Sequence, residues 1–288
     1  MIGVENYVDG DTFESIADFG FGDQYTTKHP LDINKLITFI NNFKKDRLPI
    51  IYVDSSRTRE FFSLVGDVNE KFILISHNED TIFNESDVKN KPKCIVKWYG
   101  LNINAENTED VITIPVGLER KFWSKTSHGT HANKHNKIEE YSKKEHVKNT
   151  LCYINFNVNT NRTKREWIIP HFCRNTQWSY CRMGGWRGNI DTYFRDCISS
   201  HYVMCPGGNG IDTHRTWEML YLGVVPIVER THYHQQVYGD MNVLIVDSFK
   251  EINEDFLKEQ IEKLKSRNNN EEKLYSSYWK KFIIDGAS

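Results

Sequence analysis

The chain lacks any apolar run that approaches the roughly 20 residues needed to cross a membrane. Its first residues, MIGVENYVDGD, also lack the basic start and the apolar stretch of a secretory signal peptide. We therefore expect a soluble, cytoplasmic protein with no membrane span.

An excess of basic residues is missing as well. The 288 residues contain 37 Lys and Arg against 39 Asp and Glu, which gives a formal net charge of −2. Nucleic acids and anionic membranes are bound by basic surfaces. The charge balance therefore argues against both as main partners.

Cysteine is sparse and unpatterned. No two of the six cysteines form a C-x-x-C pair, and most lie in apolar runs. The spacing predicts buried, reduced thiols rather than disulfides or zinc ligands. The six are Cys94, Cys152, Cys173, Cys181, Cys197 and Cys205.

Short apolar runs of strand length alternate with segments of helical periodicity, and hydrophobic residues make up 39% of the chain. We expect strands at 48–53, 71–76, 94–98, 111–115, 150–155, 202–205, 224–228 and 243–246. We expect helices at 33–43, 59–65, 164–171, 192–198, 213–222, 256–265 and 273–284. This alternation predicts an α/β protein made of two doubly wound domains with a cleft between them.

The stretch 124–149 is polar and lacks apolar periodicity, so we interpret it as a linker or a long surface loop. This segment places an N-terminal domain at 1–149, with the linker at its end. A second domain follows at 150–270, and a closing helix at 271–288.

The most informative segment is HYVMCPGGNGIDTHRTWEMLYLGVVPIVER, residues 201–230, which predicts a strand, a glycine turn, a helix and a second strand. Gly207, Gly208 and Gly210 allow positive φ and a close approach of the backbone to a ligand. Asp212 or Thr213 can cap the helix. Because a helix N-terminus offers free N–H groups and partial positive charge, the turn 207–210, including Asn209, suits a phosphate.

Two charged residues follow on one helix face. Arg215 lies in the first turn, where it can meet a diphosphate, and Glu218 lies one turn further, where it can accept hydrogen bonds from a ribose. The segment is neither a Walker A loop nor a G-x-G-x-x-G fingerprint. An ordinary tight turn with an Arg–Glu surface pair is the alternative.

The string GNGIDTHRTWEMLYLGVVPIV resembles the C-terminal signature of the exostosin-like (GT47-type) glycosyltransferases. FILISHNED, VKWYG and ITIPVGLERKFW resemble strand-end motifs of the soluble viral and bacterial branch. The pairing of CYINFNVNTNRTKRE with the glycine turn resembles chlorovirus β-xylosyltransferases in particular. The resemblance covers most of residues 48–247, and 206–228 is its specific part.

This resemblance implies a GT-B fold of two Rossmann-like domains and an inverting transfer from a UDP-sugar, with neither metal nor cofactor. It makes 1–149 the acceptor-binding domain and 150–270 the nucleotide-sugar-binding domain. UDP-xylose is the favoured donor, and the acceptor is a glycan for which fucose is one candidate component. Animal exostosins carry a membrane anchor that has no counterpart here, so their heparan substrates are not implied.

Inverting transfer needs positive charge on the departing diphosphate and a base for the acceptor hydroxyl. Arg215 and Arg165 are the candidates for the charge, and Arg162 and Lys164 compete with Arg165 for its role. The matching family segment also carries a basic residue near Arg165.

The base is expected where the predicted strand 71–76 ends. The next four residues are all polar, and Asp80 matches the acidic position of the family motif, so we expect it to be the base. His77 and Glu79 are weaker candidates that we expect to bind the acceptor. The alternative is a capped turn in which Asp80 begins a helix.

Two features have simpler interpretations. Asp9-Gly10-Asp11 imitates a metal-binding Asp-x-Asp without a preceding strand, and His128, His131 and His135 have ligand-like spacing in a polar stretch. We expect neither to bind a metal. A glycan-binding module without activity and a different nucleotide-sugar enzyme, or a phosphorylase of similar shape, remain the alternative functions.

Overall fold

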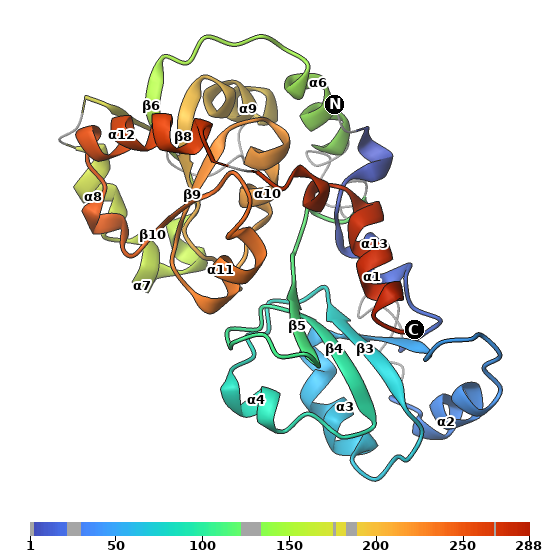
Figure 1. Ribbon diagram of the computed structural model, residues 1–288. Coiled ribbons are helices and arrows are strands. Elements are labelled where there is room, and N and C mark those ends of the chain that lie inside the picture. The colour runs from blue at the N-terminus through green and yellow to red at the C-terminus, as the bar shows by residue number, and fades with distance from the viewer. Residues whose placement is uncertain (1–2, 22–29, 122–133, 175–176, 183–188, 268) are drawn as a thin grey trace. The chain divides into compact units, whose positions relative to one another are not determined.

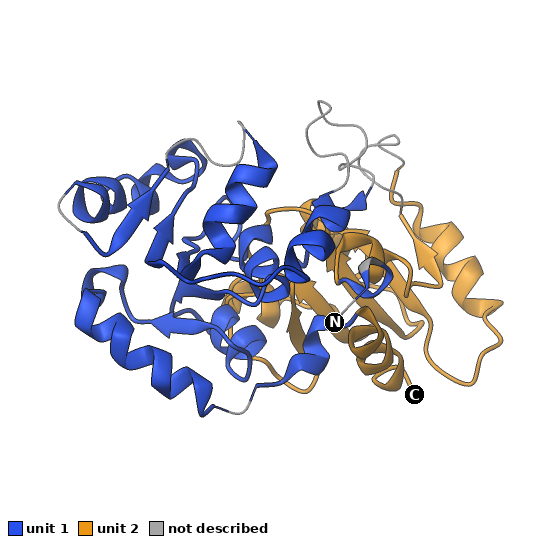
Figure 2. Cartoon of the chain, turned by 90° about the horizontal axis from the view of Figure 1, so that it is seen from above, with its two compact units in different colours: residues 1–7, 117–275 blue, residues 8–116, 276–288 orange. Residues whose placement is uncertain are grey.

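The computed structural model describes residues 3–21, 30–121, 134–174, 177–182, 189–267 and 269–288. The chain divides into two compact units (Figure 2). Unit 1 comprises Met1–Tyr7 and Gly117–Tyr275, and unit 2 comprises Val8–Val116 and Ser276–Ser288. Each unit contains one five-stranded parallel sheet, so the α/β expectation is confirmed.

The sheet of unit 2 has the order β1-β2-β3-β4-β5. Its strands are β1 (Phe19–Gly20), β2 (Ile50–Asp54), β3 (Phe72–His77), β4 (Ile95–Leu101) and β5 (Val111–Ile114). The order follows the chain without a reversal, so our expectation of a doubly wound sheet is wrong for this unit. All residues of β2 and β3 are buried, as the continuous apolar runs predicted.

Helices α2 (Ile33–Asn41), α3 (Thr58–Val65) and α4 (Glu85–Lys89) follow β1, β2 and β3 in turn. Helices from near the two ends of the chain meet in this unit, where α1 (Gly10–Glu14) lies beside α13 (Ser276–Asp285) (Figure 1). Phe13 of α1 contacts Trp279 of α13 at a ring-centroid distance of 6.3 Å. The expected closing helix is therefore present, and it completes unit 2.

The sheet of unit 1 has the order β10-β9-β8-β6-β7. Its strands are β6 (Thr150–Ile154), β7 (Ser179–Cys181), β8 (Ser200–Met204), β9 (Val225–Glu229) and β10 (Leu244–Val246). The chain goes outward from β6 to β7, then returns to the other side of β6 and continues through β8. This reversal between β6 and β8 makes unit 1 doubly wound, as predicted.

The helices of unit 1 are α6 (Lys134–Ser142), α7 (Arg162–Arg165), α8 (Ile168–Cys173), α9 (Ile190–Ile198), α10 (His214–Tyr221), α11 (His232–Tyr238) and α12 (Glu254–Lys265). They connect these strands, except α6, which precedes β6, and α12, which follows β10 (Figure 1). The expected single helix at 164–171 is two helices. Pro170 is the reason, because inside one helix its ring would collide with the carbonyl of residue 166, whereas it fits in the first turn of α8.

The polar stretch 124–149 contains α6, so our interpretation of the whole stretch as linker or loop is wrong. Ile138 and Tyr141 of α6 are buried, and the Tyr141 ring contacts Phe194 of α9 at 5.7 Å. The unit boundary consequently falls between residues 116 and 117, earlier than the expected boundary after residue 149.

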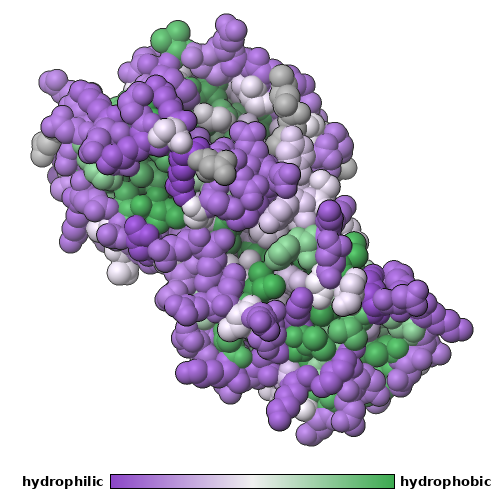
Figure 3. Space-filling view, in the orientation of Figure 1, coloured by the Kyte–Doolittle hydropathy of each residue, from purple (hydrophilic) through white to green (hydrophobic). Residues whose placement is uncertain are grey.

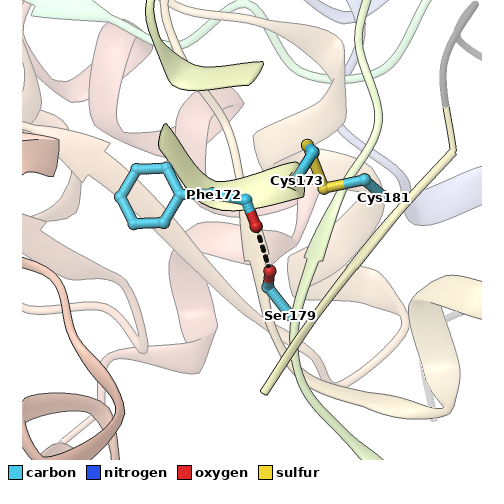
Figure 4. Close-up of a disulfide and its surroundings, with 4 residues drawn as sticks. All are labelled: Phe172, Cys173, Ser179 and Cys181. Carbon is cyan, nitrogen blue, oxygen red and sulfur yellow. Dashed lines mark hydrogen bonds between the residues drawn. A yellow bond between two sulfur atoms is a disulfide. The ribbon is translucent and has the colours of Figure 1, made fainter. Parts of the chain in front are cut away.

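One disulfide joins the end of α8 to the edge strand β7 (Figure 4). The Cα atoms of Cys173 and Cys181 are 5.6 Å apart, and the Ser179 hydroxyl donates to the Phe172 carbonyl beside them at 2.7 Å. Our expectation of six reduced thiols is wrong for this pair, because α8 packs beside β7 and brings Cys173 to Cys181. The other four are free and buried.

Within the described residues no helix is both long and apolar enough to cross a bilayer. The face of the molecule shown in Figure 3 is mainly hydrophilic, with apolar side chains in separate patches.

Candidate functional site

The carboxyl ends of β6 and β8 form the point at which the sheet of unit 1 reverses its order. Ligands of open α/β sheets bind outside the carboxyl ends of the strands at such a switch point. Two segments that the sequence analysis predicted to be functional meet here. They are the residues after β6, up to Arg165, and the glycine turn after β8.

Side chains from the first segment hold the turn in place. Arg165 is buried and donates through Nε to the Gly207 carbonyl at 3.1 Å and through Nη2 to the Pro206 carbonyl at 2.9 Å. Its Nη1 donates to the Asn157 carbonyl at 2.8 Å, and Asn161 donates to the Gly208 carbonyl at 2.8 Å. Three of the five N–H groups of Arg165 therefore support the backbone, which the sequence did not predict.

The glycines serve close packing. Neither Gly207, Gly208 nor Gly210 has a positive φ, contrary to our expectation. A Cβ at Gly208 would lie 3.2 Å from Nη2 of Arg165, and a Cβ at Gly207 would lie 3.6 Å from Nζ of the exposed Lys164. Because these two positions have no side chain, the cationic groups of Arg165 and Lys164 can lie close to the backbone of the turn.

The side chain of Asp212 is used inside the unit, where it accepts hydrogen bonds from its neighbours. Its buried carboxylate accepts hydrogen bonds from the Thr213 amide, Trp217 Nε1 and the hydroxyls of Tyr233 and Tyr238, at 2.6–3.1 Å. Thr213 is the N-cap of α10, but no side chain makes a capping hydrogen bond there. Asp212 therefore fixes the turn to α10 and α11 from inside the unit, while Asn209 is exposed at the tip.

Arg215 is half-buried in the first turn of α10. Its Nε donates to the Tyr193 hydroxyl at 3.1 Å, and its guanidinium lies over the Tyr193 ring. Neither of its terminal nitrogens has a hydrogen-bond partner among the described residues. Burial opposes the charge, but Tyr193, Cys205 and Glu218 outweigh this effect and raise the pKa of Arg215, so the group stays cationic.

Arg165 and Arg215 place two positive charges close together at the turn. Burial and then the charge of Arg215 lower the pKa of Arg165 to about 10. No carboxylate pairs with Arg165 among the described residues. The turn is thus a site of positive potential that an anion with several oxygens would neutralise.

Glu218 is buried one helical turn beyond Arg215, at the predicted spacing. One of its oxygens forms an ion pair with Lys134 of α6, and the other accepts from the Tyr193 hydroxyl at 2.8 Å. Burial opposes ionisation, but Lys134 and then Arg215 lower the pKa of Glu218, so the carboxylate is ionised. A carboxylate has about four acceptor positions, so capacity for a ribose hydroxyl remains.

We expect Glu218→Ala to lower the free energy of unfolding of unit 1 by about 3–5 kcal/mol, because it removes the nearer carboxylate from the buried Lys134 and leaves only Glu119, 3.9 Å away. Urea unfolding followed by tryptophan fluorescence, to which the buried Trp217 contributes, measures the change. The double variant Glu218→Met with Lys134→Met should lose much less than the two single variants together. Glu254→Ala, which breaks an exposed pair with Lys258 on α12, is the matched control. Additive losses at 218 and 134 would contradict a buried pair.

The polar end of β3 forms a second candidate region, in unit 2. His77 is buried and stacks on Phe13, with its ring nitrogens 2.8 Å from the Pro115 carbonyl and 2.9 Å from Oδ1 of Asn78. Asn78 has a φ of +73°, a left-handed conformation that Asn tolerates. This bend places Glu79 and Asp80 beyond the strand end. His77 itself is committed to the core of the unit.

Carboxylates gather at this edge. Asp54 ends β2 and is buried, Glu79 is half-buried, and Asp80 is exposed. Burial, then the charges of Asp54 and Asp80, raise the pKa of Glu79. The alternative in which Asp80 begins a helix is wrong, since α4 begins at Glu85 with Asn84 as its N-cap.

The two metal-like sequence features either support the fold or lie outside the described residues. Asp9 caps α1 and accepts from the Thr12 amide at 2.8 Å. His128 and His131 lie outside the described residues. His135 is in α6, and its ring packs against Tyr7. The described part of the chain contains no group of three His, Cys, Asp or Glu side chains arranged to hold a metal.

Sequence reasoning missed four residues that act on the candidates. Tyr193, Lys134 and Asn161 contact them directly, and the charge of Asp54 acts on Glu79. Comparison with known proteins assigns no function to these two regions. No family model matches the chain, and no curated protein matches it.

Proposed function

We propose that the protein is a glycosyltransferase that binds a UDP-sugar at the glycine turn of unit 1 and transfers the sugar, with inversion, to a hydroxyl of a glycan acceptor. UDP-xylose is the donor that we favour, in agreement with the resemblance to exostosin-like transferases. The proposed fold is of the GT-B type, and the proposed reaction needs no metal.

One observation carries the proposal: the unpartnered terminal nitrogens of Arg215 lie beside Arg165, at a glycine turn on the switch point of a doubly wound sheet. Planar guanidinium groups match phosphate oxygens in pairs. The site therefore suits a diphosphate better than a single carboxylate. Lys164, against Gly207, adds a third positive charge.

The proposed chemistry breaks the bond between the anomeric carbon and the diphosphate oxygen, and UDP leaves with that electron pair. The acceptor oxygen forms the new bond from the opposite face of the sugar, and its proton goes to a base. Cations fixed at the diphosphate stabilise the charge that grows on the leaving oxygen. Arg215, Arg165 and the start of α10 supply this stabilisation in our proposal, and Asp80 supplies the base.

A glycan-binding module without activity and another nucleotide-sugar enzyme are the competing functions, and turnover distinguishes them. We expect UDP release from UDP-xylose to be faster in the presence of a fucose-containing acceptor, and to persist in excess EDTA. UDP-glucose and UDP-galactose are the donor controls. Binding of UDP without release from any donor would support the module. Loss of activity in EDTA that Mn²⁺ restores would contradict the metal-independent reaction.

A further inference from the structure

A hollow with several cationic side chains lies at the end of the sheet of unit 1 that is opposite to the glycine turn. It has a volume of about 180 Å³ and is formed where β8 and β9 begin, against α12. Its lining includes the nitrogen-bearing side chains of Lys148, His201, Asn242 and Lys265. Tyr202, whose hydroxyl donates to the Leu257 carbonyl, and apolar residues such as Val225 and Ile261 form the rest. β8 is five residues long, so the hollow is roughly 15 Å from the glycine turn.

The hollow has an unbalanced charge. None of its lining residues is acidic. Lys148 donates to the Ser200 carbonyl at 2.8 Å, and it has no carboxylate partner among the described residues. Lys265 pairs with Glu262 on its own helix, and Glu262 is the only acidic side chain that an ion pair brings to any described lining residue.

Titration properties agree with this imbalance. Burial lowers the pKa of Lys148. Burial, then the charges of Lys148 and Lys265, lower the pKa of His201. Each of these groups is therefore harder to protonate than it is in water, because no negative charge compensates it.

We propose that this hollow binds a small tetrahedral oxyanion of the phosphate class. Two ammonium groups, an imidazole and an amide offer N–H donors from four segments of the unit, and they meet no competing carboxylate in the lining. The volume lies below the roughly 300–1,000 Å³ of pockets for larger ligands, which fits a single phosphate group. The site is separate from the glycine turn, and it does not depend on the proposed transfer reaction.

The test is an NMR titration of the His201 ring, assigned with His201→Gln, in the full-length protein. Titrations run in chloride and in inorganic phosphate at equal ionic strength, with UDP present throughout. We expect phosphate to raise the pKa of His201 by about one unit, because a bound anion favours the imidazolium form. Binding should accordingly weaken as the pH rises through that pKa.

Two variants remove the cations separately. Lys148→Met and Lys265→Met should each raise the pKa of His201 in chloride and reduce its response to phosphate at least severalfold. Lys258→Met, on α12 but outside the hollow, should respond as the wild type does. Equal His201 pKa values in chloride and phosphate, or a full response in both hollow variants, would overturn the proposal.

Sulfate and glycerol 2-phosphate identify the source of the anion. A response to phosphate and sulfate but not to the ester indicates a free ion. A response to all three indicates the phosphate group of a larger molecule.

Discussion

Asp80→Asn is expected to slow sugar transfer by about 10²–10⁴-fold, the usual contribution of a general base. A sugar hydroxyl is a poor nucleophile, and the asparagine keeps the shape of the side chain but cannot take its proton. The affinity for UDP should stay unchanged, because our proposal places the nucleotide in unit 1. Steady-state transfer rates and calorimetric titration with UDP measure the two quantities.

The control for this experiment is Asp67→Asn, an exposed aspartate in the segment that precedes β3. It should leave the transfer rate unchanged. Near-wild-type transfer by Asp80→Asn would exclude Asp80 and make Glu79→Gln the next variant. If Glu79 is the base, the acid limb of the pH–rate profile should lie above the ordinary range of a glutamate, because its pKa is raised. That limb should then move to lower pH in Asp80→Asn, which removes a neighbouring negative charge.

The sequence predicted the strands that are continuously apolar and the turn that is rich in glycine. β2, β3, β6 and β8 lie within two residues of their expected bounds, since full burial between helices requires uninterrupted hydrophobic runs. The short edge strands β1 and β7 were missed, because two or three residues on an edge bury too little to leave a pattern. The helix α6 was missed for a related reason, as only a few of its side chains reach the core.

The residues that contact the candidate site residues were harder to predict than the candidates themselves. The spacing of Arg215 and Glu218 on one helix face follows from local geometry. Tyr193, which contacts both, comes from α9, and Lys134 comes from a stretch that we interpreted as a loop. Arg165 shows the same limit: its charge was visible in the sequence, but its hydrogen bonds to the turn depend on β6 and β8 being neighbours. Contacts of this kind depend on topology, which local patterns do not contain.

Arg215→Met is expected to lower kcat by about 10²–10³-fold, the effect of removing one donor that stabilises transition-state charge. Methionine keeps much of the apolar stem, so the variant mainly loses the cation and its free N–H groups. Because charge builds on the diphosphate as the glycosidic bond breaks, KM for the UDP-sugar should change much less than kcat. Initial rates over a range of donor concentrations separate the two constants.

Arg165→Met should behave differently, and the contrast tests the assignment of both arginines. Its three hydrogen bonds to backbone carbonyls hold the turn, so its loss should weaken UDP binding as well as slow turnover. Arg195→Met, which removes an exposed arginine of α9, is the matched control and should retain full activity. A rise in KM alone for Arg215→Met would make Arg215 an anchor for the bound phosphate. The charge on the leaving group would then have to be stabilised by Arg165, Lys164 and the start of α10.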